Sequence, residues 1–562
     1  MATGMSKAVK AGVLWLVITA TVWALTLWQW RRTPEAVSGR DIVWQLIVVP
    51  LVLTVVALLA WRMVQRLRAL ADRPVDAAPQ PGGTLGLAAT ATPGAGAQPS
   101  SDCVPEQPVA TVLAEALSLA AGHGAAEAWH ALKEARVRPG LDPELRDADG
   151  LPVFSARAPD LDLNDWLLAH GELSQSGSAP LPEQVLRTLA LLEAPLHHLL
   201  DVLTTWRPEQ VERVWDAGSV HRGHEPMSSL PAGAPSHLSG VGRPDSQAAR
   251  QARAERAPVL QVRLCLPAIW GSDDRDRALD WVRSQCGALL DWTEAHGAPP
   301  PEWRADWWAP GWAADAGPET LWTELASQWP SWSASPRPQL LLLLAADTAV
   351  DDGCVAQWQA RGELFTSHHQ RGRVPGEAGV GLLLANRAWE AWCHMPAGEQ
   401  PTASARDDIA VCPRLWQPQA LRRERSADVI GRVDARCTQA LLQGVAERLT
   451  PHADGDWAVV SDGDHRASRT AEVFEALLAV RPQADPMLSV VRVGDGCGDL
   501  GLARALATVA LASAGLRQGE PASVALALLV QDTLQRVVVP LTPPSAQWPT
   551  ALPETAPTAS PT

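Results

Sequence analysis

The chain has 562 residues, of which 46% are hydrophobic, and this is ample material for a large buried core. Its formal net charge of −15 argues against nucleic acid as a partner. The eight cysteines are scattered and form no C-x-x-C pair, which argues against a disulfide framework or a zinc site and fits a reducing compartment.

Two uncharged apolar runs at 11–30 and 42–61 open the chain. Each is about 20 residues long, the length that an α-helix needs to cross a bilayer. The first run is too long for a signal peptide, and Arg31 and Arg32 close it without a cleavage site. We therefore predict two transmembrane helices within residues 1–73.

Lysines and arginines around these runs predict the orientation. The two outer flanks, which share one side of the membrane, hold six of them, against three in the connecting loop. The positive-inside rule then places both chain ends in the cytoplasm. The skewed composition, with 26 Trp, no Tyr and three Lys, is typical of a GC-rich bacterial genome. The expected location is a bacterial inner membrane, crossed twice.

Composition divides the remainder of the chain. Residues 74–105 are rich in Pro, Ala and Gly and predict a flexible linker. Residues 106–541 are expected to form one domain, with a disordered insertion at 217–254 and a disordered tail at 542–562. A stretch rich in Trp and Pro covers 298–338, and its tryptophans predict either core packing or an exposed protein-binding surface.

Strand and helix patterns alternate through this domain. Strands are predicted at 109–117, 151–157, 259–268, 340–347, 378–387, 456–462, 487–493, 523–531 and 536–541. Helices are predicted at 125–135, 183–203, 275–292, 355–361, 420–449, 468–480 and 500–515. Near-continuous apolar strands between helices indicate an α/β protein with a buried mixed sheet.

Several motifs occur in an order that resembles the thiolase fold, specifically the β-ketoacyl-acyl-carrier-protein synthase family. The segment AAEAWHALKEARV precedes the strand GLPVFSAR, and VPGEAGVGLLLANR at 374–387 is similar to the family's glutamate turn. WAVVSDGDHRASRTAEVFEAL and VGDGCGDLGLARALATVALA then resemble its two histidine loops. The resemblance spans about 109–541. It implies a five-layer α-β-α-β-α duplication and a homodimer formed through an edge strand, here expected at 259–266.

The catalytic residues of that family are missing at the matching positions. The nucleophilic cysteine would fall at 309–319, which contains no cysteine. The first histidine position falls at Asp462, with His465 nearby but out of register, and the second falls at Asp499. These degenerate positions favour a pseudoenzyme.

The residues leave alternatives open. Cys497 lies in a glycine loop before a helix, where the thiol pKa could be low, and Cys354 follows a strand, so either could be a displaced nucleophile. Asp462, Asp464 and His465 follow a strand and could line a ligand pocket or simply form a turn. The glycines at 494–501 suit a phosphate cradle poorly and a tight turn well, and we expect no cofactor and no metal.

Two functions remain at this stage. The first is a membrane-anchored, inactive synthase-like scaffold that binds other membrane or cytoplasmic proteins, for example in a type VI-like secretion assembly. The second is an active acyl-transfer or acyl-binding enzyme that uses Cys497 or Cys354.

Overall fold

The structure is a computed structural model that describes residues 108–171, 173, 180–205, 258–295, 299–308, 317–389, 411–429, 431–449 and 455–544. The predicted transmembrane runs, the linker 74–105, the insertion 217–254 and the tail beyond 544 lie outside these residues. In the described part of the chain, no helix is long and apolar enough to cross a membrane.

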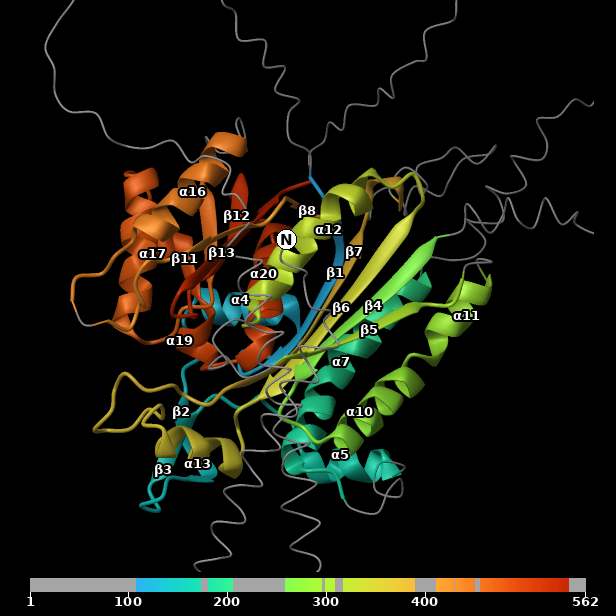
Figure 1. Ribbon diagram of the computed structural model, residues 1–562, viewed down its shortest axis with the longest axis horizontal. Helices are drawn as coiled ribbons and strands as arrows, with labels where there is room; N and C mark the ends of the chain where they lie inside the picture. Colours follow the sequence, from blue (N-terminus) through green and yellow to red (C-terminus); the bar gives the residue numbers. More distant parts are fainter. Residues whose placement is uncertain are drawn as a thin grey trace, which may run out of the picture. The chain divides into compact units, whose positions relative to one another are not determined.

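One large mixed sheet organises the described residues (Figure 1). Its strand order is β11-β10-β12-β13-β8-β1-β7-β6-β4-β5, and β9 pairs with β13. The amino-terminal half contains β1 (Ala110–Leu119), β4 (Val259–Pro267), β5 (Glu302–Trp308), β6 (Gln339–Thr348) and β7 (Glu377–Ala385). The carboxy-terminal half contains β9 (Gln419–Arg422), β10 (Trp457–Ser461), β11 (Val490–Arg492), β12 (Val524–Leu529) and β13 (Gln535–Thr542). The short strand β8 (Arg414–Leu415) pairs with β1 and β13 and joins the halves.

The sheet is buried on both faces. Every residue of β1, β7 and β12 is buried. Because successive side chains of a strand point to opposite faces, such strands require cover on both sides. The predicted mixed α/β architecture is confirmed.

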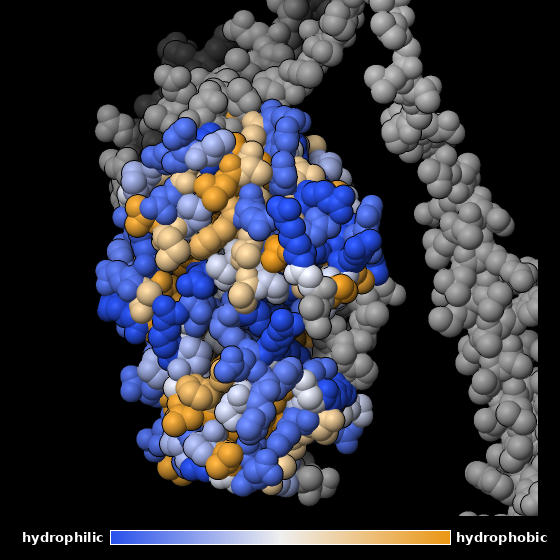
Figure 2. All heavy atoms as spheres, turned by 90° about the vertical axis from the view of Figure 1, so that its left-hand side faces the viewer, coloured by the Kyte–Doolittle hydropathy of each residue, from blue (hydrophilic) through white to orange (hydrophobic). Residues whose placement is uncertain are grey.

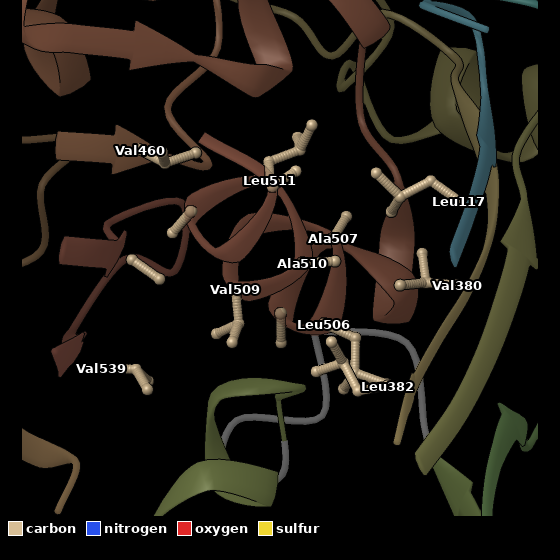
Figure 3. Packing of buried hydrophobic residues seen from close by; sticks show 14 of the residues in the cluster. Leu117, Val380, Leu382, Val460, Leu506, Ala507, Val509, Ala510, Leu511 and Val539 are labelled. Atoms are coloured by element: carbon tan, nitrogen blue, oxygen red, sulfur yellow. The ribbon is translucent and has the colours of Figure 1, made fainter. Parts of the chain in front are cut away.

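Three central helices lie between the two halves of the sheet. They are α4 (Ala125–Lys133), α12 (Glu319–Ala334) and α20 (Arg504–Arg517). They share one hydrophobic cluster with side chains from both halves. Figure 3 shows α20 between Leu117, Val380 and Leu382 of one half and Val460 and Val539 of the other. The many alanines of α20 allow this close approach from every side, and residues 504–516 are all buried.

Further helices cover the outer faces. The amino-terminal half carries α5 (Leu163–Ala169), α7 (Glu183–Thr205), α10 (Ser272–Gln285) and α11 (Gly287–Ala295). The carboxy-terminal half carries α16 (Arg436–Arg448) and α17 (Ala467–Val480). The layers are therefore outer helices, sheet, central helices, sheet and outer helices. Figure 2 shows the side that bears α16 and α17, where hydrophilic atoms predominate and apolar atoms form separate patches.

Smaller elements complete the described chain. β2 (Gly140–Arg146) and β3 (Pro152–Ser155) form a hairpin, and its apolar side chains pack against those of α13 (Asp352–Ala360). β2 has no counterpart among the predicted strands. α18 (Pro486–Ser489), α19 (Val493–Cys497) and the 3₁₀ turn η3 (Gly501–Ala503) connect the last strands and helices.

The predicted helix at 420–449 is wrong in its first half. β9 occupies Gln419–Arg422 and pairs with β13, and α16 begins only at Arg436. Between them, Gly431 has a φ of 149°, which a helix does not allow. The pairing of β9 with β13 and the turn at Gly431 therefore outweigh the spacing of apolar residues that predicted a helix here. The predicted helix at 275–292 is likewise two helices, α10 and α11, which meet at Cys286.

The expectation that 259–266 forms a free edge strand is also wrong. β4 pairs with β6 on one side and in parallel with β5 on the other. β5 comes from the Trp/Pro-rich stretch, in which the spacing predicts no strand. Among the described residues, β5 is therefore the edge strand of the amino-terminal half of the sheet.

Tryptophans of the same stretch lie in the core. Trp322, Trp329 and Trp332 of α12 are buried in the central cluster. Their packing confirms the core reading for these three residues, and the exposed-surface reading is wrong for them.

Candidate functional site

A cavity of about 940 Å³, here called the main cavity, opens where the two halves of the sheet meet the amino-terminal ends of α12 and α20. Its wall takes residues from the end of β6, the loops after β10 and β12, and the turns before α12 and α20. They include Asp347, His465, Asp499, Arg504 and Gln531. Of the cluster expected after β10, His465 borders the cavity, while Asp462 and Asp464 are buried and do not line it.

Arg504 is one of the arginines that line the main cavity. It is the first residue of α20, and its Nη2 donates to Glu319 at the start of α12. Its Nε lies 3.4 Å from Asp462 Oδ2, and its Nη1 donates to the Gly501 carbonyl over 3.0 Å. Burial alone would lower the pKa of Arg504, but the surrounding carboxylates raise it above its ordinary range. The guanidinium is thus permanently charged and ties both halves together.

Asp462 is a buried acceptor directly after β10. Its Oδ1 accepts the backbone amides of Val530 at 2.6 Å and Gln531 at 3.1 Å. Burial raises its pKa to about 7, although Arg504 acts in the opposite direction. The carboxyl therefore holds the turn after β12 in place and is only partly ionised near neutral pH.

Asp499 is ion-paired and fully charged. Arg373 Nε donates to its Oδ2 over 2.6 Å, and the Gly501 amide donates to its Oδ1 over 2.9 Å. Burial alone would raise the pKa of Asp499, but Arg373 and Arg504 outweigh it and hold that pKa well below its usual range. Arg373 also lies over the Trp358 ring at 4.1 Å. Both oxygens of the Asp499 carboxylate therefore already accept hydrogen bonds from within the protein.

Asp347, at the end of β6, is a second carboxyl with a raised pKa. Its Oδ2 accepts the Leu502 amide over 2.9 Å. Burial, reinforced by nearby Asp499, raises its pKa to about 7. Gly501 lies against it with a φ of 55°, and a Cβ at that position would lie 2.0 Å from Asp347 Oδ2. The turn before α20 therefore needs a glycine.

His465 and Asp464 occupy the loop after β10. The His465 ring packs edge-on against Phe365 at 5.0 Å, and its Nε2 lies 3.2 Å from the Gln370 carbonyl oxygen. Asp464 binds Arg466 and accepts Gln531 Nε2 over 2.8 Å. His465 therefore lies at the cavity wall, while Asp464 is buried behind it.

Neither candidate nucleophile has an activated thiol. Cys497 is the last residue of α19 rather than the first of a helix, it is fully buried, and burial raises its pKa to about 12. Cys354 lies in the cavity wall, but burial and the negative charge of Asp347 raise its pKa to about 12 as well. The low pKa on which the displaced-nucleophile hypothesis depends is absent at both positions.

The glycines around Cys497 serve packing. Gly498 has a φ of 66°, and a Cβ there would lie 2.8 Å from the Val374 carbonyl oxygen. A Cβ on Gly376 would lie 2.2 Å from the Cys497 carbonyl oxygen. This close approach agrees with the tight-turn reading of the glycines. The described residues contain no group of three or more His, Cys, Asp and Glu side chains placed to hold a metal ion.

The sequence pattern indicates Asp462, His465 and Asp499 but not the residues that pair with Asp462 and Asp499. Arg504 gave a usable signal, because a lone arginine at the start of an otherwise apolar helix needs a buried anion. The sequence contains no such signal for Glu319 or Arg373. Glu319 pairs with Arg504 and Arg373 pairs with Asp499, and each pair joins segments more than a hundred residues apart in the chain.

Comparison with known proteins finds ketosynthases among the solved structures that resemble the chain. The ishigamide ketosynthase/chain length factor matches at 15% identity over 78% of this chain and 99% of that one, with a TM-score of 0.41. A type II polyketide ketosynthase in complex with its acyl-carrier protein matches at 11% over 78% and 100%, with a TM-score of 0.43. An oxazolomycin ketosynthase domain of Streptomyces albus JA3453 matches at 12% over 79% and 76%, with a TM-score of 0.42. No protein-family model and no curated protein matches the chain.

Proposed function

We propose that this chain is a membrane-anchored, catalytically inactive, thiolase-like protein that binds partner proteins at the cytoplasmic face of a bacterial inner membrane. One observation carries the loss of catalysis. The two carboxylates at the degenerate histidine positions, Asp462 and Asp499, belong to a buried ion-pair network with Arg504 and Arg373.

This network opposes condensation chemistry in physical terms. A thioester carbonyl that is attacked develops negative charge, and a synthase stabilises it with hydrogen-bond donors. The ionised Asp499 repels such charge, and Arg373 is already engaged by that carboxylate. Neither Cys354 nor Cys497 supplies a thiolate at neutral pH.

Intact-protein mass spectrometry tests this inactivity. The detergent-solubilised chain, incubated with acyl-thioesters, should gain no stable acyl group. Asp499→His should also gain none, because the nucleophile is still missing. An adduct that disappears with Cys354→Ala would support the acyl-transfer enzyme instead, and fast, selective iodoacetamide labelling of that thiol at neutral pH would point the same way.

The membrane anchor is proposed from the two apolar runs and their flanking charges. A reporter fused after Thr562 that works only in the cytoplasm should be active. Activity of a periplasm-only reporter at the same position would overturn this topology.

Partner binding is proposed because a membrane-anchored domain without catalytic activity would act by binding other proteins. Identification of the proteins that co-purify with the solubilised chain tests this, and components of a type VI-like secretion assembly are one expectation. A homodimer is also proposed, and β5 rather than β4 would form its edge. A monomer at micromolar concentration in sedimentation would contradict the dimer.

A further inference from the structure

Two arginines at the start of α17 share one carboxylate, which belongs to the loop after β9. Arg469 lies in the first turn of α17, and Arg466 directly precedes the helix. Arg469 Nη2 donates to Asp428 Oδ1 over 2.8 Å, and Arg466 Nη1 lies 3.7 Å from the same oxygen. Arg466 and Asp428 both line the main cavity. An anionic group of the protein itself therefore lies beside two guanidinium groups in the cavity wall.

Asp428 compensates the charge of Arg469 incompletely. The Arg469 side chain has no exposed surface, whereas the Asp428 side chain is 48% exposed. The Nε and Nη1 groups of Arg469 have no hydrogen-bond acceptor among the described residues. Burial and the neighbouring charge of Arg466 lower the pKa of Arg469, and Asp428 acts against them. A buried guanidinium with a partly solvated counter-ion is stabilised by any additional negative charge beside it.

The backbone of α17 supplies two further donors at the same place. Ala467 and Ser468 are the first residues of this helix, and both line the main cavity. Helix geometry gives their N–H groups no carbonyl partner within α17, and no other described residue accepts them. No side chain caps this end of the helix. An uncapped helix amino terminus carries partial positive charge and favours anions, above all phosphate groups.

The turn that carries Asp428 is attached to α17 through this carboxylate. The backbone amides of Asp428 and Val429 donate to Ser426, within the turn itself. Ala427 donates its amide to the Thr533 carbonyl over 2.8 Å and so fixes the start of the turn. Val429 lines the cavity and is exposed. Asp428 can therefore leave the two arginines by a local movement that leaves β9 and α16 in place.

The donors at this place match a phosphate group better than a second carboxylate. They are Arg466 Nη1, Arg469 Nη2 and the N–H groups of Ala467 and Ser468. A carboxylate has two oxygens, whereas a phosphate monoester offers three that share nearly two negative charges at neutral pH. Arginine binds such groups in fixed, directed geometry.

We propose that Arg466, Arg469 and the amino terminus of α17 bind a phosphate group, free or esterified, and that Asp428 occupies this site until phosphate displaces it. The inference goes beyond the proposed function, and it depends neither on the loss of catalysis nor on the membrane anchor.

The test measures binding of inorganic phosphate to the detergent-solubilised full chain by calorimetry at pH 8 and constant ionic strength. Asp428→Asn removes the internal competitor and leaves both arginines in place. Its affinity for phosphate should exceed that of the wild type about fivefold or more. A gain of affinity identifies Asp428 as a competitor, because loss of a merely structural residue would leave binding unchanged or weaken it.

Two variants control for charge and for place. Asp280→Asn removes the same charge from an exposed position on α10 and should leave affinity unchanged. Ala467→Pro, added to Asp428→Asn, removes one N–H donor and should weaken phosphate binding several-fold at an unchanged melting temperature. Proline is tolerated at the first position of a helix, and the extended backbone of Arg466, with a ψ of 119°, suits the residue before a proline.

Absence of saturable phosphate binding by Asp428→Asn would overturn the proposal, as would an equal gain in Asp280→Asn or full affinity after Ala467→Pro. Titration of n-butyl phosphate distinguishes the two sources of the group. Tighter binding of the ester than of inorganic phosphate would assign the site to an esterified phosphate whose chain lies in the main cavity, and equal or weaker binding would assign it to free phosphate.

Discussion

Individual residues of the main cavity show how tightly its carboxyl groups are packed. Gly501 fits beside Asp347 only because it lacks a side chain, and its backbone lies in the left-handed region. Two separate costs would therefore accompany a larger residue: backbone strain and a collision with the half-buried Asp347 carboxyl group.

Gly501→Ala separates these costs when it is compared with Gly150→Ala. Gly150 has a similar φ of 75°, but a Cβ there meets nothing within 4 Å. We expect Gly150→Ala to lower the free energy of unfolding by about 1 kcal/mol and Gly501→Ala by about 3 kcal/mol or more. Thermal or urea unfolding of the two variants measures the difference. Equal losses would show that Asp347 moves aside without cost.

The raised pKa values of Asp347 and Asp462 predict the pH dependence of stability. A carboxyl whose folded pKa lies above its unfolded value stabilises the fold fully below the unfolded pKa, near 4, and this stabilisation is lost as pH rises through the folded value. Asp499 has the opposite shift, and its contribution is lost only in strong acid.

The melting temperature of the chain should therefore rise as pH falls from 8 toward 5, as the two raised carboxyls take up protons. Asp462→Asn keeps the acceptor for the Val530 amide and removes the ionisable group, so it should flatten this slope. A wild-type melting temperature that falls steadily over the same range would contradict the prediction.

At the scale of elements, the glutamate of the VPGEAG turn holds β7 to the outer helix α7. Glu377 is fully buried and accepts both Nε and Nη2 of Arg187, over 2.5 and 2.8 Å. It also accepts the Ala158 amide and the Thr348 hydroxyl. The glutamate of this turn, whose sequence resembles the glutamate turn of synthases, thus has a structural task in this chain.

Glu377→Gln should lower the free energy of unfolding by about 3 kcal/mol, because Arg187 is then buried without its counter-ion. The double variant Arg187→Met with Glu377→Leu should recover part of the loss, since no unpaired charge is left. A double-mutant cycle by urea unfolding measures the coupling. The exposed pair Arg283–Asp280 is the control, and its coupling should not exceed about 0.5 kcal/mol.

Most elements could be predicted because their apolar spacing agrees with their final environment. The central helix α20 and the strands β6 and β7 read correctly from sequence alone. β9 and β5 did not, because both are polar or Trp-rich segments whose strand form depends on a neighbour already in place. The same holds for the site. Residues that directly follow a strand could be predicted from the sequence, whereas ion pairs between distant segments could not.

At the scale of the whole described domain, the central cluster makes the two halves interdependent. It contains side chains of α12 from the amino-terminal half and α20 from the carboxy-terminal half, and Trp322 Nε1 donates to the Ala505 carbonyl over 3.0 Å. Neither half can bury its inner face alone.

A fragment of residues 106–541 should therefore unfold in one cooperative transition. Differential scanning calorimetry measures this, and the calorimetric and van't Hoff enthalpies should agree. Two well-separated transitions would show that each half retains its own core.

The central position of α20 has a consequence for the folding of the chain during its synthesis. β1 pairs with β7 along one edge, but its other edge needs β8, about three hundred residues later, and β1 also packs against α20 near the end of the domain. During synthesis the amino-terminal half therefore keeps an open sheet edge and an uncovered apolar face until α20 has left the ribosome. Folding of this domain is thus expected to be a late event that depends on chaperones, and a chain truncated before α20 should aggregate rather than accumulate as a stable half.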